Sequence, residues 1–309
     1  MSDANSNLEP DAADPSPKVL GRGDPGWTDA TWNGATPPQL PDNSLLQKLR
    51  GVLRLLCFVL ATLALLPVYF IARLMGQGPN RYVAGLWCGV GAFLCGLRLR
   101  RLGQPIRTSG VIVANHATWI DILTIGPSAP VHFVAKAEVS SWPFFGWIGK
   151  ISDTVFIERR RTEAKAQERH LIDRALDGDL LCLFPEGTSS DGMRVLPFKS
   201  SLFSMFYATD RSATELLVQP LSIHYAPAPN SNLPSNFYGW WGRMPLFKQI
   251  WDVTCLSSAG SATLEFHDPL RPGDFENRKS LASAAQESVA LGRERAAIDA
   301  QLARSRATN

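Results

Sequence analysis

The chain has 309 residues, of which 45% are hydrophobic, and carries a formal net charge of +3 at pH 7. This size and composition suffice for one sizeable α/β domain with appendages. Residues 1–44 hold seven acidic and two basic side chains, so the remainder of the chain is basic. A basic body suits an anionic partner such as a membrane surface, an acidic lipid or an acidic carrier protein. Nucleic acid is the competing partner, but no aromatic-basic motif or zinc-ligand spacing supports it.

The first 44 residues form a Pro-rich acidic tail. They contain seven prolines, few aliphatic residues and no hydrophobic periodicity. This composition predicts disorder, and the first residues, Met1–Ala4, lack the basic start of a secretory signal. The five cysteines of the chain form no C-x-x-C pair. Their pattern predicts buried, reduced thiols and a catalytic domain that faces the cytoplasm.

Two apolar stretches follow the tail and predict a membrane anchor over residues 45–102. Leu55–Ala72 is an uncharged run of eighteen residues, close to the roughly 20 that a bilayer-spanning helix needs. Val83–Leu97 is shorter and rich in glycine, which favours a re-entrant or interfacial helix. Basic residues at both outer ends place these ends on the cytoplasmic side of a bacterial inner membrane. A hairpin, a pair of helices in one leaflet and two core helices of a soluble protein all remain open.

From residue 103 the chain alternates between strand-like and helix-like segments. The expected strands are 110–114, 131–135, 154–158, 180–184, 217–224 and 263–266. The expected helices are 162–176, 200–208 and a polar C-terminal helix near 277–304. This alternation predicts an α/β domain over residues 103–275, with a mixed, mostly parallel sheet flanked by helices, and a C-terminal helix and tail over 276–309. Active sites in such sheets lie beyond the carboxyl ends of the strands.

His116 and Asp121 follow the expected strand 110–114 and are the first candidates for chemistry. On one continuous helix, a spacing of five residues would point the two side chains to different sides. They can meet if Asn115 caps a helix that begins at Ala117, with Asp121 one turn into it. Asp121 would then accept from one ring nitrogen and leave the other to act as a general base. A structural pair and a fragment of a metal site compete with this interpretation, but no further ligand falls at metal-binding spacing.

Four short blocks then occur in order along the chain. They are Asn115-His116-x4-Asp121, Val155-Phe156-Ile157-Glu158-Arg159, Phe184-Pro185-Glu186-Gly187-Thr188 and Val218-Gln219-Pro220-Leu221-Ser222-Ile223. Their combination resembles the four-block signature of the glycerolipid acyltransferase family, whose best-known members are 1-acyl-glycerol-3-phosphate acyltransferases. The resemblance spans residues 50–270 and includes the apolar segment ahead of the first block.

The resemblance implies transfer of a fatty acyl group from a thioester of acyl carrier protein or coenzyme A to a lysolipid hydroxyl, without a cofactor. A hydroxyl is a weak nucleophile near neutral pH, so His116 would remove its proton during the attack. Arg159 would bind the anionic head of the acceptor, for which a planar, bidentate cation is suited. Glu186, Gly187 and Thr188 would shape the acceptor site, where glycine permits close backbone approach.

Three further residues are candidates for substrate binding. Asn115 adjoins the base, while Lys136 and Lys199 could bind the phosphate of the carrier or of the head group. Each family assignment also has a structural alternative. In these alternatives, Arg159 is a surface arginine, residues 185–188 form only a turn and helix cap, and each lysine is a solvated side chain.

The sequence departs from the commonest family pattern after the third block. Residues 188–192 read T-S-S-D-G, and serines follow Lys199 where phosphatidate-forming members usually have arginine and glycine. With the aromatic stretch 238–242, this looks more like the bacterial branch that acylates lyso-ornithine lipid. We predict 1-acyl-sn-glycerol-3-phosphate as the acceptor, giving phosphatidate, with lyso-ornithine lipid nearly level. A catalytically silent lipid-binding protein and a lipid or thioester hydrolase are the other function classes considered.

Overall fold

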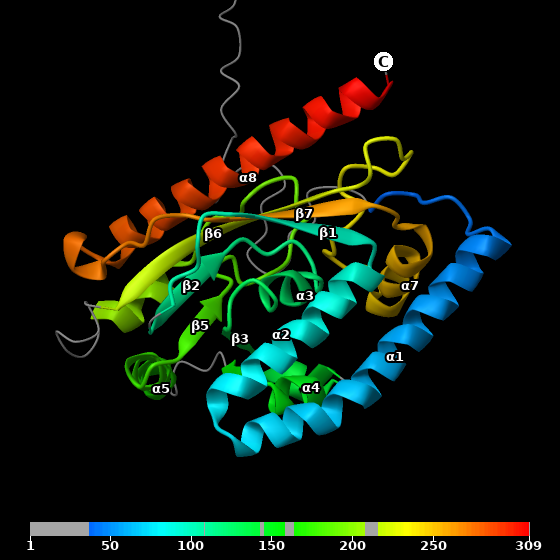
Figure 1. The fold of residues 1–309 in the computed structure, drawn as a ribbon. Coiled ribbons are helices and arrows are strands. Elements are labelled where there is room, and N and C mark those ends of the chain that lie inside the picture. Colours follow the sequence, from blue (N-terminus) through cyan, green and yellow to red (C-terminus); the bar gives the residue numbers. More distant parts are fainter. Residues whose placement is uncertain (1–36, 108, 143–144, 158–163, 208–215, 309) are drawn as a thin grey trace, which may run out of the picture.

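A mixed β-sheet with helices on both faces forms the centre of the molecule (Figure 1). The computed structural model describes residues 37–107, 109–142, 145–157, 164–207 and 216–308. Within these residues, seven strands pair in the order β1-β7-β6-β2-β5-β3-β4. The strands are β1 (Leu97–Leu102), β2 (Gly110–Ala114), β3 (His132–Lys136), β4 (Val155–Ile157), β5 (Leu180–Leu183), β6 (Leu217–Ala226) and β7 (Gly260–Phe266). Only β6 and β7 pair antiparallel, so the predicted mixed, mostly parallel sheet is confirmed.

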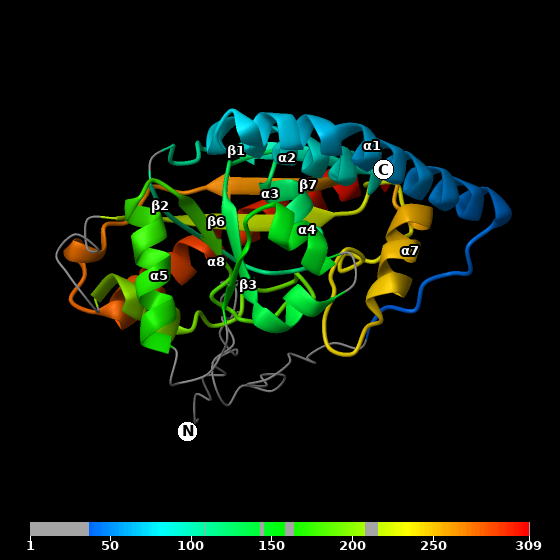
Figure 2. The same cartoon turned by 90° about the horizontal axis from the view of Figure 1, so that it is seen from below.

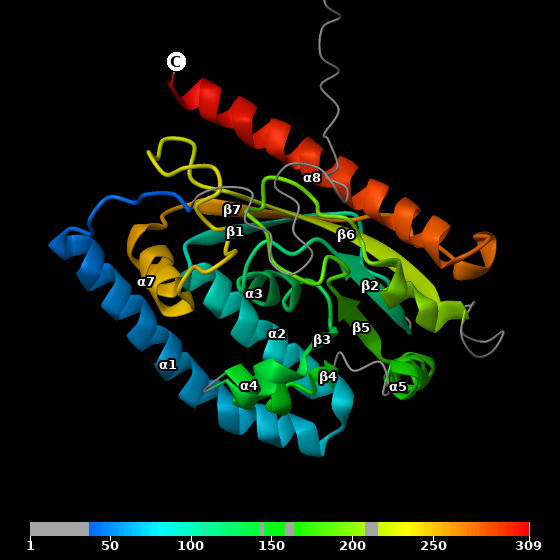
Figure 3. The ribbon, with the colours of Figure 1, turned by 180° about the vertical axis from the view of Figure 1, so that it is seen from behind.

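The helices cover the sheet in two layers. They are α1 (Leu45–Leu74), α2 (Gln77–Leu94), α3 (Asp121–Ile125), α4 (Phe145–Ile151), α5 (Ala164–Leu176), α7 (Leu246–Leu256) and α8 (Arg278–Thr308), with 3₁₀ helices η1 (Ala137–Ser141), η2 (Ser200–Tyr207) and η3 (Pro272–Asp274). Figures 1 and 3, which are opposite views, both place α8 on one side of the sheet and α1 and α2 on the other. The predicted helices 162–176, 200–208 and 277–304 correspond to α5, η2 and α8, apart from residues outside the described ranges.

The central strand β2 shows why the sheet has a core on each face. Successive side chains of a strand point to opposite faces. Ile112 and Ala114 join the core beneath α2, α3 and α7, whereas Val111 and Val113 join the core formed with α5, η2 and α8. All five β2 residues are buried, as expected for a strand covered on both faces. The apolar run 110–114 therefore places the end of β2, and the residues that follow it, at the centre of the fold.

Besides α4, η1 and η3, two described elements lie outside the predicted pattern. The first is β1, which the prediction included in the membrane anchor but which pairs with β7 at the edge of the sheet. Its exposed arginines, Arg98, Arg100 and Arg101, are those that the prediction assigned to the cytoplasmic flank of the anchor. Charged side chains on an edge strand also discourage pairing with other chains. The second is α7, an amphipathic helix between β6 and β7 where no helix was predicted.

Helix α1 presents an apolar face that the described chain leaves uncovered. It starts with a capping box, in which the Gln47 N–H donates to Ser44 Oγ and the Ser44 N–H donates to Gln47 Oε1. Of the described helices, α1 is the one long and apolar enough to cross a membrane. Only 11% of its most apolar 18-residue segment is buried. Figure 2 shows α1 running along α2, with α7 beneath its first half. All five cysteines are unpaired, but Cys57 on this helix is exposed, so the predicted burial is wrong for that residue.

Two arginines join α1 to the rest of the domain. Arg50 donates through Nε to the Cys255 carbonyl at 2.9 Å, and Arg54 donates to the carbonyls of Thr254 and Ser257 at 2.9 and 2.8 Å. These carbonyls lie at the C-terminus of α7, where unpaired carbonyl groups and the helix dipole favour a cation. The basic residues before the apolar run thus hold α1 against the domain.

Candidate active site

The turn between β2 and α3 brings His116 and Asp121 into contact. The His116 Nδ1 atom lies 2.7 Å from the Asp121 Oδ2 atom. The same oxygen accepts the backbone N–H groups of Ala117 at 2.9 Å and Thr118 at 3.2 Å. Because the backbone curls around this carboxylate, two side chains that are five residues apart meet.

This geometry corrects two predictions about the turn. Helix α3 begins at Asp121 and not at Ala117, since the N–H groups ahead of it bond to the Asp121 side chain. Asn115 is not a helix cap, because its amide donates to the Ile223 carbonyl at 3.0 Å and its oxygen accepts the Ile223 N–H at 2.8 Å. Asn115 is also 1% exposed. It joins β2 to β6, and both polar atoms of its side chain are occupied by Ile223.

The second oxygen of Asp121 is also occupied. The Tyr225 hydroxyl donates to Asp121 Oδ1 at 2.7 Å and lies 3.0 Å from the Thr124 hydroxyl. Asp121 has no exposed surface and accepts four hydrogen bonds, whereas the His116 side chain is 22% exposed. With the carboxylate as acceptor, Nδ1 carries the proton of a neutral imidazole, which leaves Nε2 able to accept a proton.

The backbone and ring of His116 are fixed by the loop after β5. The His116 N–H donates to Glu186 Oε2 at 3.2 Å, and its carbonyl accepts the Ser190 N–H at 2.9 Å. The Phe184 ring stacks on the imidazole with a centroid separation of 4.3 Å and an interplanar angle of 23°. The first and third sequence blocks therefore form one unit, in which the third block orients the histidine.

Glu186 acts in this unit as a buried bridge. Its other oxygen, Oε1, accepts the Leu196 N–H at 3.0 Å, and the residue is only 1% exposed. Burial raises the pKa of the Glu186 carboxyl well above its usual value, and the nearby carboxyl groups of Asp121 and Asp191 act in the same direction. The two backbone N–H groups oppose this shift. Glu186 therefore shapes the site by joining the His116 turn to the strand-like segment at Leu196.

The residues that follow Glu186 form the tight turn predicted from the sequence. Gly187 has a φ of +69°, a left-handed conformation that glycine adopts without strain, and its N–H donates to the Phe184 carbonyl at 3.0 Å. Thr188 is half-buried beside it. The Lys199 N–H donates to the Pro185 carbonyl at 3.0 Å, so the backbone of Lys199 lies against the same turn.

The two remaining candidates are Lys136 and Arg159. Lys136 is the last residue of β3, which runs parallel to β5 and β4, so it lies at the same carboxyl edge as the end of β2. Arg159 follows β4 and is outside the described residues. In the described part of the chain, no three His, Cys, Asp or Glu side chains gather as metal ligands.

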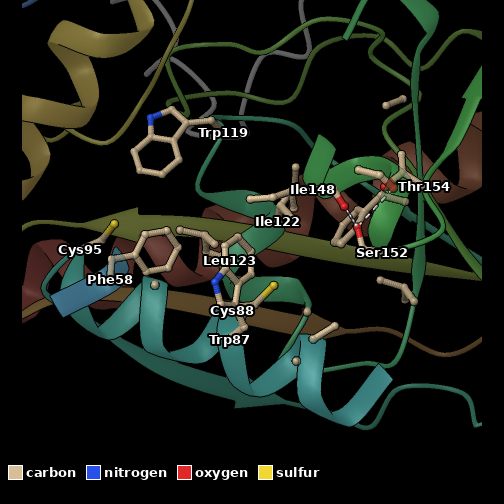
Figure 4. Close-up of a pocket in the computed structure, with 18 of the residues that line it drawn as sticks. Phe58, Trp87, Cys88, Cys95, Trp119, Ile122, Leu123, Ile148, Ser152 and Thr154 are labelled. Carbon is tan, nitrogen blue, oxygen red and sulfur yellow. Dashed lines mark hydrogen bonds between the residues drawn. The ribbon is translucent and has the colours of Figure 1, made fainter. Parts of the chain in front are cut away.

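A cavity of about 480 Å³ lies beside this turn, between α1, α2, α3, α4 and α7. Its walls are largely apolar, and Figure 4 shows part of them, including Phe58, Trp87, Leu123, Trp119 and Ile148. Trp119 lies three residues after His116, and its indole N–H donates to Gln249 Oε1 at 2.6 Å. Phe133, also in the wall, stacks on Phe184 at 6.5 Å, and Phe184 in turn stacks on His116. Phe184 thus lies between the imidazole of His116 and Phe133 in the cavity wall.

Comparison with known proteins assigns the chain to a family. Residues 100–224 match the family described as Acyltransferase. A lyso-ornithine lipid O-acyltransferase of Rhodobacter capsulatus is 38% identical over 268 residues, which cover 84% of this chain and 96% of that protein. The chain belongs to the acyltransferase family.

One further relative and a solved structure agree with this assignment. A 1-acyl-sn-glycerol-3-phosphate acyltransferase of Neisseria meningitidis is 39% identical over 145 residues, covering 46% of this chain and 56% of that protein. The crystal structure of the 1-acyl-sn-glycerophosphate (LPA) acyltransferase PlsC from Thermotoga maritima superposes with a TM-score of 0.60 at 23% identity, covering 81% of this chain and 97% of that one. That likeness supports the fold. The predicted family and enzyme class are confirmed.

Three side chains of the acyltransferase site have roles that sequence reasoning missed. Phe184 and Ser190 lie in or next to the third block, so their proximity to Glu186 was the available signal for a role near the base. Tyr225 lies just beyond the predicted strand 217–224, and no spacing connects it to Asp121. Only the pairing of β6 beside β2 brings its hydroxyl to the carboxylate.

Proposed function

We propose that this acyltransferase is membrane-bound and transfers a fatty acyl group from a thioester to the hydroxyl of lyso-ornithine lipid. The observation that supports this acceptor is the 38% identity to a lyso-ornithine lipid O-acyltransferase across 96% of that protein. The sequence motifs alone favoured 1-acyl-sn-glycerol-3-phosphate by a narrow margin. The Rhodobacter capsulatus relative, which matches over nearly its whole length, favours lyso-ornithine lipid instead.

His116 serves as the general base in this proposal. With Nδ1–H held by Asp121, Nε2 takes the proton of the acceptor hydroxyl as its oxygen attacks the thioester carbonyl. The tetrahedral intermediate then collapses, the carbon–sulfur bond breaks, and the imidazolium returns the proton to the leaving thiolate. Asp121 stabilises the imidazolium formed between these steps. The residues invoked need no acyl-enzyme intermediate and no resident cofactor.

The apolar cavity beside the turn suits the fatty acyl chain of the donor. Its apolar walls suit a hydrocarbon chain. The stacked rings of Phe133 and Phe184 lie between the cavity and His116, so a chain bound there would bring its thioester carbon close to the base. The donor is acyl carrier protein or coenzyme A, and the basic body of the chain suits either of these acidic carriers.

The acceptor head would bind on the opposite side of the turn from the cavity. Arg159, Lys136 and Lys199 are the proposed cations for its anionic group, and the backbone of Gly187 and Thr188 supports the bound lipid. Lyso-ornithine lipid offers a carboxylate, and 1-acyl-sn-glycerol-3-phosphate offers a phosphate. The second acceptor is the alternative because the Neisseria meningitidis relative, named for it, is 39% identical over 145 residues.

Attachment to the bacterial inner membrane, with the catalytic domain in the cytoplasm, completes the proposal. The uncovered apolar face of α1 supports it, as do the basic residues at the start of that helix. A membrane location also gives access to acceptors that are themselves lipids.

The decisive experiment uses membranes that contain the full chain and labelled acyl carrier protein. Lyso-ornithine lipid and 1-acyl-sn-glycerol-3-phosphate are offered separately, and labelled lipid products are quantified. We expect ornithine lipid from the first. His116→Ala should abolish transfer, whereas His170→Ala, which changes an exposed histidine on α5, should not.

Each other outcome assigns a different function. Product from 1-acyl-sn-glycerol-3-phosphate alone would show that this lipid, and not lyso-ornithine lipid, is the acceptor. Labelled free fatty acid at the same rate with and without a lysolipid would indicate a hydrolase. No product with either acceptor and either carrier would indicate a lipid-binding protein without activity.

A further inference from the structure

The C-terminal helix α8 comes closest to the sheet at one short segment. Figures 1 and 3 show α8 lying along β6, and the Ser222 hydroxyl on β6 donates to the Val289 carbonyl at 2.8 Å. A Cβ atom on Gly292 would lie 2.4 Å from Ser222 Oγ and 2.7 Å from the ring of His267. Only glycine therefore allows this approach. The register of α8 on β6 is fixed here.

The next residue of the helix, Arg293, reaches the loop that orients His116. Arg293 is only 7% exposed, and its Nε donates to the Gly192 carbonyl at 3.1 Å. The guanidinium charge also interacts with the carboxylate of Asp191, which is 2% exposed and pairs with Arg194. A buried arginine requires such partners, because an uncompensated charge in the interior is strongly unfavourable.

Hydrogen bonds continue from this loop to the histidine. The Gly192 N–H donates to Ser190 Oγ at 3.2 Å, and the Ser190 N–H donates to the His116 carbonyl at 2.9 Å. Gly192 also packs against Ala117, the residue after His116. Arg293 is thus connected to the His116 backbone through two residues of one loop, with every contact buried or half-buried.

The other side of the Arg293 guanidinium makes no competing hydrogen bond in the described chain. Its Nη2 atom is buried without a partner, as is the Nδ1 atom of His224 on β6. Burial, together with the nearby Arg293 charge, lowers the pKa of His224 to about 3, so the imidazole is neutral at physiological pH. The described hydrogen bond of Arg293 is therefore directed to the loop at Gly192.

We propose that Arg293 is a positioning residue for acyl transfer, which holds the loop 190–192 and through it the backbone of His116. The proposal rests on the proposed role of His116 as base. Arg293 does not touch the reacting atoms. Its effect on the reaction is to keep Nε2 of His116 at the correct place relative to the hydroxyl and the thioester.

The test compares Arg293→Met and Arg293→Lys with Arg295→Met in the full-length protein in detergent. Arg295 lies on the same helix and pairs with Glu265, but its side chain is 60% exposed and does not contact the loop. The values of kcat and of KM for donor and acceptor are measured with each variant, alongside its unfolding temperature.

Arg293→Met should lower kcat by about 100-fold with little change in either KM, because a shift of about 1 Å in a reacting group has an effect of this size. Arg293→Lys should recover most of kcat, since its ammonium can still donate to the Gly192 carbonyl. Arg295→Met should leave kcat unchanged. Equal kcat in the two Met variants, or a loss confined to KM, would overturn the proposal.

A second measurement applies if Arg293→Met does not fold. Arg293→Gln, which keeps an NH₂ donor but removes the charge, and Ser190→Ala are then combined in a double-mutant cycle on kcat. Two residues acting through one loop should show a double effect smaller than the product of the single effects. Multiplicative effects would refute the proposal. If the unmodified protein transfers no acyl group at all, the proposed function itself fails and this role falls with it.

Discussion

Replacing Asp121 by asparagine tests the charge that supports His116 while leaving the turn intact. The side-chain oxygen near His116 accepts two backbone N–H groups as well as the imidazole. These donors force the carbonyl oxygen of the new amide to face His116, so its NH₂ group faces Tyr225. The Tyr225 hydroxyl can then accept from the amide and donate to Thr124, which already lies 3.0 Å away. Asp121→Asn should therefore fold with the same imidazole tautomer.

The expected loss follows from the one property that changes, the charge. Hydrogen bonds to charged groups contribute about 1.5–3 kcal/mol, compared with about 1 kcal/mol for neutral pairs. This charge matters most when the imidazolium forms, so the difference of about 0.5–2 kcal/mol should lower kcat by about 2- to 30-fold, at about 1.4 kcal/mol per factor of ten. A loss of about 10⁴-fold, typical of a wrong tautomer, is not expected because the backbone donors fix the amide orientation.

Acyl transfer from labelled acyl carrier protein gives kcat and KM, and thermal unfolding in detergent reports stability. Tyr225→Phe is the matched control, since it removes a partner of Asp121 but keeps the charge; it should reduce stability more than kcat. Asp252→Asn changes another buried carboxylate, on α7, that is not part of the site. A kcat for Asp121→Asn equal to that of the unmodified protein, or a loss no larger than that of Asp252→Asn, would refute the reasoning.

Three further substitutions probe the framework around the base. Glu186→Gln should lower the free energy of unfolding by about 1–3 kcal/mol and reduce kcat, because the NH₂ group that replaces one carboxylate oxygen cannot accept the backbone N–H now paired with it. Unchanged stability in denaturant would contradict this. Gly292→Val should lower the unfolding temperature, since its side chain would collide with Ser222 and shift α8, whereas a stable variant with normal kcat would show that the helix adapts. His224 has a pKa of about 3 when folded and about 6.5 when unfolded, so the unfolded state binds the extra proton and stability falls as the pH drops from 6.5 toward 3. At pH 5 this amounts to about 2 kcal/mol, which His224→Gln should remove in a comparison of unfolding at pH 7.5 and pH 5; equal pH slopes would refute it.

The sequence predicts the strands of this fold better than its turns. Strand 110–114 agrees with the structure at both ends, because a continuous apolar run between polar segments has few alternative placements. The same reasoning fails for β1, where arginines alternate on an edge strand directly after an apolar helix. The composition of this stretch does not separate the apolar helix α2 from the strand β1, so both are assigned to one anchor. Pairing with β7, which is more than 150 residues away, decides the assignment and is not visible locally.

The candidate site shows the same division between local and distant information. The proximity of His116 and Asp121 follows from sequence spacing once a turn is assumed, but the turn itself depends on the carboxylate accepting backbone N–H groups. The prediction that Asn115 caps a helix fails because Ile223, its actual partner, belongs to a strand one hundred residues later. Tyr225 and Arg293 could not be found at all from spacing, since each reaches the site only through packing of β6 and α8.

The placement of α1 has a consequence for anyone who wishes to work with a water-soluble form of this acyltransferase. One face of α1 is bare and apolar, but its other face supplies Leu55 and Phe58 to the wall of the cavity. Removing the helix to improve solubility would also open that cavity to water, and a fragment starting at residue 103 would lose the edge strand β1 as well. The bare apolar face and part of the cavity wall belong to one helix, so truncation cannot remove the first and keep the second.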